Sequence, residues 1–167
     1  SGVLIRHDVD RSEGQALKLA VLEKNLGINA TYYFRTKTFK PRLVKQISEL
    51  GFEIGYHYED LAESKGDYIL AKKYFTKNLS KFREIVDIST IAMHGRPLSK
   101  HDSRDYWNKY SLEEFGLSAE AFLSINYEEF HYFTDTGRSW SESAPNLRDK
   151  VNSKISKDEN IDSTDDL

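Results

Sequence analysis

The apolar positions of the chain fall into short runs that alternate with helical repeats. Runs of apolar, β-branched and aromatic residues predict strands at residues 3–8, 28–34, 52–56 and 88–93. The first of these begins with three apolar residues that we expect to be buried. Between the strands, apolar residues recur at helical spacing over residues 13–25, 41–50 and 67–86. Gly27 and Gly51 follow the first two helical segments, as is typical of helix ends.

Strands that alternate with helices predict an α/β domain with a parallel sheet wrapped by helices, either doubly wound or closed as a barrel. Farther along, residues 111–114 predict a capping box before a short helix, and residues 122–125 and 130–134 predict two more short strands. The composition turns polar from Pro145 onward, so we expect one domain over residues 1–144 and a polar tail, a frayed helix or linker, over residues 145–167.

The composition narrows the class of protein. The net charge is −3 over 167 residues, without the excess of basic residues typical of nucleic-acid-binding proteins, so no nucleic-acid partner is expected. Cysteine is absent, which excludes disulfides, thiolate metal sites and cysteine nucleophiles. No apolar stretch is long enough to span a membrane and no signal peptide is visible, so we expect a cytoplasmic protein. The chain starts almost inside its first strand, which suggests a fragment of a longer protein.

The end of the first strand carries two acids, Asp8 and Asp10, one residue apart. Alternation along an extended chain points both to one side, where their charges repel unless a metal, a shared proton or an arginine offsets the repulsion. Hydrolytic sites are often built in this way. The structural alternative is an aspartate that caps the next helix beside a solvated neighbour.

Other predicted strands also end in residues that carry chemistry. In parallel α/β folds these ends share one rim, which would gather the residues Asp8, Asp10, Arg35, His57, His94, Arg96 and Asp135, with Arg138 and Trp140 close behind Asp135. One aspartate and two histidines suit zinc or a similar divalent ion and leave a position open for water. Each of these residues could instead have a purely structural role. His57 could hydrogen-bond Glu59 or Asp60, and the arginines could be surface charges. Tyr56 and Trp140, which could stack on a sugar ring, could also be packing residues.

These motifs resemble the polysaccharide deacetylase family (NodB homology, carbohydrate esterase family 4), in particular members near surface-polysaccharide biosynthesis genes. The sequence His-Asp-Val-Asp at residues 7–10 resembles the family's first motif. Residues 29–34 resemble its Ala-Thr-Phe-Phe strand, residues 51–57 its Gly-His-Glu-Ile-Gly-x-His stretch, and residues 95–97 its arginine–proline motif. Residues 135–140 are similar to its later Asp-Trp motif.

The resemblance implies a distorted (β/α) barrel of about seven parallel strands, incomplete in this chain if a C-terminal strand is missing. It also implies that Asp8 is the general base and that Arg96 orients this base. Asp10 and His57 would be ligands of a divalent metal ion, which we expect to be zinc. Arg35, Tyr56, Asp135, Arg138 and Trp140 would then contact a carbohydrate substrate.

Two departures from the family pattern leave alternatives open. Leu61 occupies the position of the family's second metal histidine, and no Leu-x-His sequence follows Trp140 to supply the general acid. His94 could provide the missing ligand from the next strand, or the site could have lost its chemistry. The leading hypothesis is a metal-dependent deacetylase of an N-acetylated amino sugar in a polysaccharide or its precursor. The alternatives are a degenerate deacetylase-like domain that binds carbohydrate or scaffolds a biosynthetic complex, and a metal-dependent amidase of a small molecule.

Overall fold

The structure is a computed structural model that describes residues 2–96, 99–127, 129, 132 and 134. The chain divides into two compact units, residues 1–121 and 122–167. The fold and the candidate site described below belong to the first unit. The predicted strand at residues 130–134, the three candidate residues Asp135, Arg138 and Trp140, and the polar tail fall largely or wholly outside the described residues.

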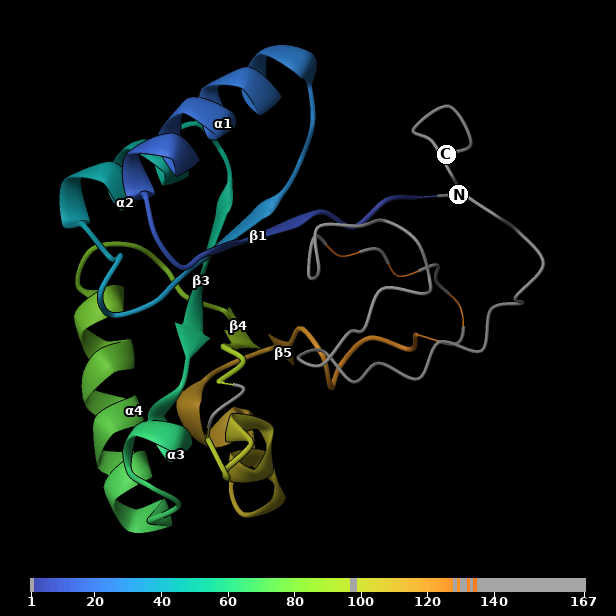
Figure 1. Cartoon of the computed structure of the whole chain (residues 1–167). Coiled ribbons are helices and arrows are strands. Elements are labelled where there is room, and N and C mark those ends of the chain that lie inside the picture. Colours follow the sequence, from blue (N-terminus) through green and yellow to red (C-terminus); the bar gives the residue numbers. More distant parts are fainter. Residues whose placement is uncertain (1, 97–98, 128, 130–131, 133, 135–167) are drawn as a thin grey trace. The chain divides into compact units, whose positions relative to one another are not determined.

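The first unit is built on a sheet of five parallel strands (Figure 1). The strands are β1 (Arg6–Val9), β2 (Thr31–Phe34), β3 (Glu53–Tyr58), β4 (Thr90–Met93) and β5 (Ala119–Glu120). The helices are α1 (Glu13–Leu26), α2 (Pro41–Glu49), α3 (Asp60–Glu63) and α4 (Tyr68–Arg83), followed by the 3-10 turns η1 (Ser103–Asn108) and η2 (Glu113–Phe115). The α/β class predicted from the pattern is therefore confirmed.

The strands follow one another across the sheet in chain order, β1-β2-β3-β4-β5. A doubly wound sheet reverses its strand order at a switch point, whereas a (β/α) barrel does not. The order is therefore compatible with part of a barrel. The seven strands that the family resemblance implies are not seen among the described residues.

Two strand predictions were wrong in position. The first strand begins at Arg6, where pairing with Thr31 of β2 starts, and the apolar residues before it are not buried: Val3 is 83% and Leu4 69% exposed. The fifth strand is Ala119–Glu120, and residues 122–125 form turns and bends instead of a strand. In both cases apolar composition suggested a strand at residues that lie just outside the ladder of paired strands.

The predicted capping box is confirmed, but the helix behind it is a single 3-10 turn. The Glu114 amide donates to Ser111 Oγ over 3.3 Å, and the Ser111 amide donates to Glu114 Oε1 over 3.4 Å. Gly116, with a φ of 62°, ends the turn in the left-handed region.

Alternation along the strands separates two faces of the sheet. On one face, Tyr56 and Tyr58 pack against Phe75 of α4.

On the other face the ring of Tyr33 crosses Gly55, where a Cβ atom would lie 2.2 Å from Tyr33 Cε1. Glycine is required at this position because the ring needs the space, and the Tyr33 hydroxyl then donates to Thr90 Oγ1 over 3.1 Å. The same alternation directs Asp8 and His57 to this second face.

The side chain of Tyr56, expected to contact the substrate, is buried away from the rim. Its side chain is 1% exposed, and its hydroxyl donates to Asp60 Oδ2 over 2.8 Å. Asp60 also accepts from Asn78 Nδ2 over 2.8 Å. Burial of the Asp60 carboxyl raises its pKa to about 7, although both hydrogen bonds oppose the shift.

This buried carboxyl makes the stability of the fold depend on pH. The pKa of Asp60 in the folded protein lies above its ordinary value of 3.8. Its contribution to the free energy of unfolding is therefore fully present below about pH 4 and is lost as the pH rises towards 7. Asp60→Asn should remove this loss, which we expect to be on the order of 2–4 kcal/mol between pH 4 and 7. Urea unfolding across this range measures it, with the exposed Asp87→Asn as control; equal pH dependence in wild type and Asp60→Asn would contradict the assignment.

Candidate metal centre

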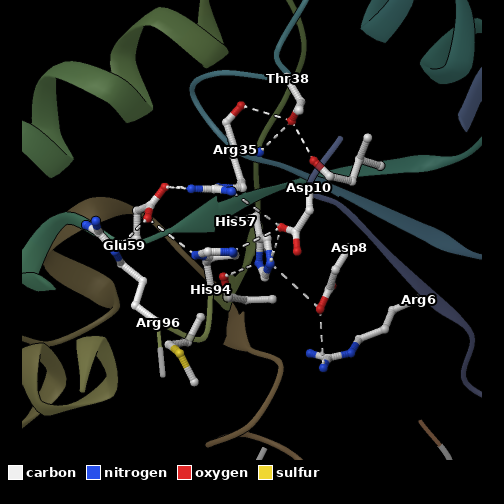
Figure 2. Close-up of polar contacts among 12 residues, drawn as sticks. Arg6, Asp8, Asp10, Arg35, Thr38, His57, Glu59, His94 and Arg96 are labelled. Atoms are coloured by element: carbon white, nitrogen blue, oxygen red, sulfur yellow. Dashed lines mark hydrogen bonds and ion pairs between the residues drawn. The ribbon is translucent and has the colours of Figure 1, made fainter. Parts of the chain in front are cut away.

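Three side chains from different strand ends converge at one edge of the sheet (Figure 2). Asp10 follows β1, His57 lies in β3 and His94 follows β4. Asp10 Oδ1 lies 3.5 Å from His57 Nε2 and 3.3 Å from His94 Nε2. Asp8 points to the same place, with its Oδ2 3.8 Å from His57 Nε2. The sequence prediction that these residues share one rim is met in the structure, and the group of Asp10, His57 and His94 could hold a metal ion.

The spacing of these atoms fits a zinc-like ion. Nitrogen and oxygen ligands bond zinc at about 2.1 Å, so two ligand atoms of a tetrahedral site lie about 3.4 Å apart. The two Asp10–histidine distances are within 0.1 Å of that value. Asp10 Oδ1 is also buried without a hydrogen-bond partner of standard geometry among the described residues. A buried carboxylate oxygen in this state is suited to bind a cation.

His57 is held in the tautomer that a metal ligand requires. Its Nδ1 lies 3.0 Å from the Ala92 carbonyl oxygen, the residue paired with it across β3 and β4. A carbonyl only accepts, so the proton sits on Nδ1 and the lone pair of Nε2 faces Asp10. Burial lowers the pKa of His57 despite the opposing charges of Asp8 and Asp10. The lowered pKa favours the neutral ring, and the hydrogen bond of Nδ1 goes to a backbone carbonyl rather than to Glu59 or Asp60.

His94 lies between two carboxylates. Its Nε2 faces Asp10, and its Nδ1 lies 3.3 Å from Glu59 Oε2. Burial lowers the pKa of His94, but the contacts with Asp10 and Glu59 outweigh it and the net shift is upward. Asp10, although partly buried, has a lowered pKa because His94, His57 and Arg35 surround it. A proton and a metal ion would therefore compete for His94 Nε2.

The arginines take places that differ from those expected. Arg35, at the end of β2, turns towards Glu59, with hydrogen bonds of 2.9 Å from Nε and 2.5 Å from Nη2 to Glu59 Oε1. Its Nη1 lies 4.0 Å from Asp10 Oδ1. These contacts tie Arg35 to the site's own acids, so its prediction as a substrate contact has no support here.

The arginine beside the predicted base is Arg6. Its Nη2 lies 3.5 Å from Asp8 Oδ2. Arg96, expected to orient Asp8, instead has its Nε 3.5 Å from Glu59 Oε2. The position of Arg6 two residues before Asp8 on the same strand face explains the pairing, because residues i and i+2 of a strand lie side by side.

Glu59 is the residue that sequence reasoning missed. The sequence suggests it only as an acid after the strand and a possible hydrogen-bond partner of His57. In the structure it is 3% exposed and contacts Arg35, His94 and Arg96. The signal available was alternation, since Glu59 follows His57 by two positions and extends the same face. Leu61, in the position of the family's second histidine, is buried at 2% exposure in α3, and β4 supplies His94 to the rim instead.

None of the helices in the described part of the chain is both long and apolar enough to cross a membrane. Comparison with protein-family models and with curated proteins found no match to this chain. The resemblance to polysaccharide deacetylases therefore rests on the sequence motifs alone.

Proposed function

We propose that this protein is a metal-dependent deacetylase that acts on an N-acetylated amino sugar of a polysaccharide or its precursor, with zinc as the metal. The observation that carries the proposal is the convergence of Asp10, His57 and His94, whose candidate ligand atoms lie within 4.8 Å of one another. The two distances from Asp10 Oδ1 to the histidine Nε2 atoms, 3.5 and 3.3 Å, suit a tetrahedral site. An additional carboxylate, Asp8, stands beside these three residues. Three ligands with an adjacent base are what metal-assisted amide hydrolysis requires.

Each residue has a distinct part in this proposal. Asp10, His57 and His94 would hold the metal, which when bound polarises the amide carbonyl and lowers the pKa of water. Asp8 would act as general base, because its carboxylate lies within 4 Å of His57 Nε2 and 30% of its side chain is open to solvent. Arg6, with its Nη2 3.5 Å from Asp8 Oδ2, would orient this carboxylate. The residue that protonates the leaving amine is not identified among the described residues.

The buried Leu61 favours one second candidate, a deacetylase-like domain that binds carbohydrate without turnover. A site that relies on His94 departs from the family's ligand set, so its chemistry could have been replaced by binding. The two candidates differ in whether acetate is formed.

Acetate release decides between them. Zinc-loaded protein should release acetate from N-acetylglucosamine oligomers or from a panel of other N-acetylated amino sugars, and a chelator should stop the reaction. The control is the same protein restored with zinc. Tight binding of a sugar without acetate release from any substrate would favour the binding domain.

A further inference from the structure

We infer that Glu59 is the positioning residue of this centre, orienting two of its three candidate metal ligands at once. The inference rests on the proposed metal site but concerns a residue outside the ligand set. Glu59 lies in the turn between β3 and α3, and its two oxygens face different partners (Figure 2). Oε1 accepts from Arg35, and Oε2 faces His94 and Arg96.

The first action is on His94. Glu59 Oε2 lies 3.3 Å from Nδ1 of His94, whose Nε2 is directed to Asp10. If Nε2 bonds a metal, the proton of the ring sits on Nδ1 and faces the Glu59 carboxylate. A carboxylate partner also increases the basicity of the coordinating nitrogen, more than a neutral carbonyl does. His57 has the neutral partner, the carbonyl of Ala92, and His94 has the charged one.

The second action is on Asp10, through Arg35. Glu59 receives two hydrogen bonds from the Arg35 guanidinium, which fixes the plane of that group. The remaining nitrogen, Nη1, is thereby left 4.0 Å from Asp10 Oδ1. The chain Glu59–Arg35–Asp10 thus connects the ends of β3, β2 and β1 and limits the movement of the Asp10 carboxylate.

A purely structural salt bridge would not require this arrangement. Arg35 alone could compensate the buried charge of Glu59 through Oε1. Oε2 and His94 Nδ1, however, are both buried without a hydrogen bond of standard geometry among the described residues, and they lie 3.3 Å apart. Arg96 Nε, 3.5 Å from Oε2, is the other charged group near this oxygen. The free-energy cost of burying Glu59 Oε2 is explained if this oxygen orients the imidazole ring of His94.

Glu53 offers a matched control within the same strand. It lies on the same face of β3, and its carboxylate accepts from Thr31 Oγ1 over 2.7 Å and from Thr90 Oγ1 over 2.8 Å. It has no contact with Asp10, His57 or His94. Glu53→Gln therefore perturbs a carboxylate of this sheet face without touching the metal centre.

The test compares the zinc dissociation constants of wild type, Glu59→Gln, Glu59→Asp and Glu53→Gln by competition with a chromophoric chelator. Glu59→Gln should weaken zinc binding about 10–100-fold, the size typical of lost outer partners of metal ligands. Glu59→Asp, which retains the charge, should recover part of the loss, and Glu53→Gln should stay within about twofold of wild type. Unchanged affinity in a folded Glu59→Gln variant, or an equal loss in Glu53→Gln, would overturn the inference.

A second readout needs no variant. Imidazole ¹⁵N spectra of the zinc-loaded wild type should show His94 bonded to zinc through Nε2, with its proton on Nδ1. Coordination through Nδ1 would overturn the role of Glu59. These outcomes differ from a failure of the proposed function, in which the wild-type protein itself binds no zinc or releases no acetate.

Discussion

Asp8→Asn should greatly slow acetate release while leaving zinc affinity within about twofold of wild type. Asparagine cannot take a proton from water, so the loss should be about 10²–10⁴-fold in kcat, the range typical of a removed general base. Its amide has nearly the same shape as the carboxylate and can remain beside Arg6 and His57. The measurement is turnover of zinc-saturated protein, with Asp87→Asn as the control at an exposed position.

The reverse pattern would show that the roles of the two acids are exchanged. If Asp8→Asn lost zinc while Asp10→Asn retained it, Asp8 would be the ligand and Asp10 the base. The distances argue against this exchange, because Asp10 Oδ1 approaches both histidines and Asp8 only His57.

His94→Ala should weaken zinc binding by at least about tenfold, and by about 100-fold or more if the remaining ligands cannot be supplemented. Catalytic zinc sites ordinarily use three protein ligands, and the removal of His94 leaves only Asp10 and His57. The measurement is calorimetric titration with zinc. His101→Ala, at an exposed histidine of the loop that follows, is the matched control and should change nothing.

Unchanged zinc affinity in a folded His94→Ala protein would show that His94 is a loop residue. The domain that binds carbohydrate without turnover would then become the better account. Thermal unfolding of the variant separates this outcome from a general loss of structure.

The rim could be predicted because it depends on simple periodicities. Parallel strands in chain order bring their carboxyl ends to one edge, so His57 and His94 had to lie near Asp10 once each was placed after a strand. Helix ends were also predictable: Gly27 adopts a φ of 71° after α1, where left-handed backbone favours glycine.

The partners of the charged side chains could not be predicted in the same way. Arg6, Arg35 and Arg96 all lie at the rim, and which acid each one meets depends on side-chain length and on strand twist. The role of Glu59 was hidden for this reason, since alternation places it on the face of His57 but does not show which charged side chains it contacts. Tyr56 was misplaced because an aromatic near a strand end faces either the rim or the helices, and here it packs on Phe75 and Phe82.

The central claim is that Asp10, His57 and His94 bind one metal ion together. A crystal structure of zinc-loaded protein, with anomalous diffraction recorded at the zinc edge, tests it directly. We expect one anomalous peak about 2 Å from Asp10 Oδ1, His57 Nε2 and His94 Nε2, with Asp8 beside it but not bonded to it. The absence of a peak between these three atoms in crystals that hold zinc elsewhere would contradict the claim.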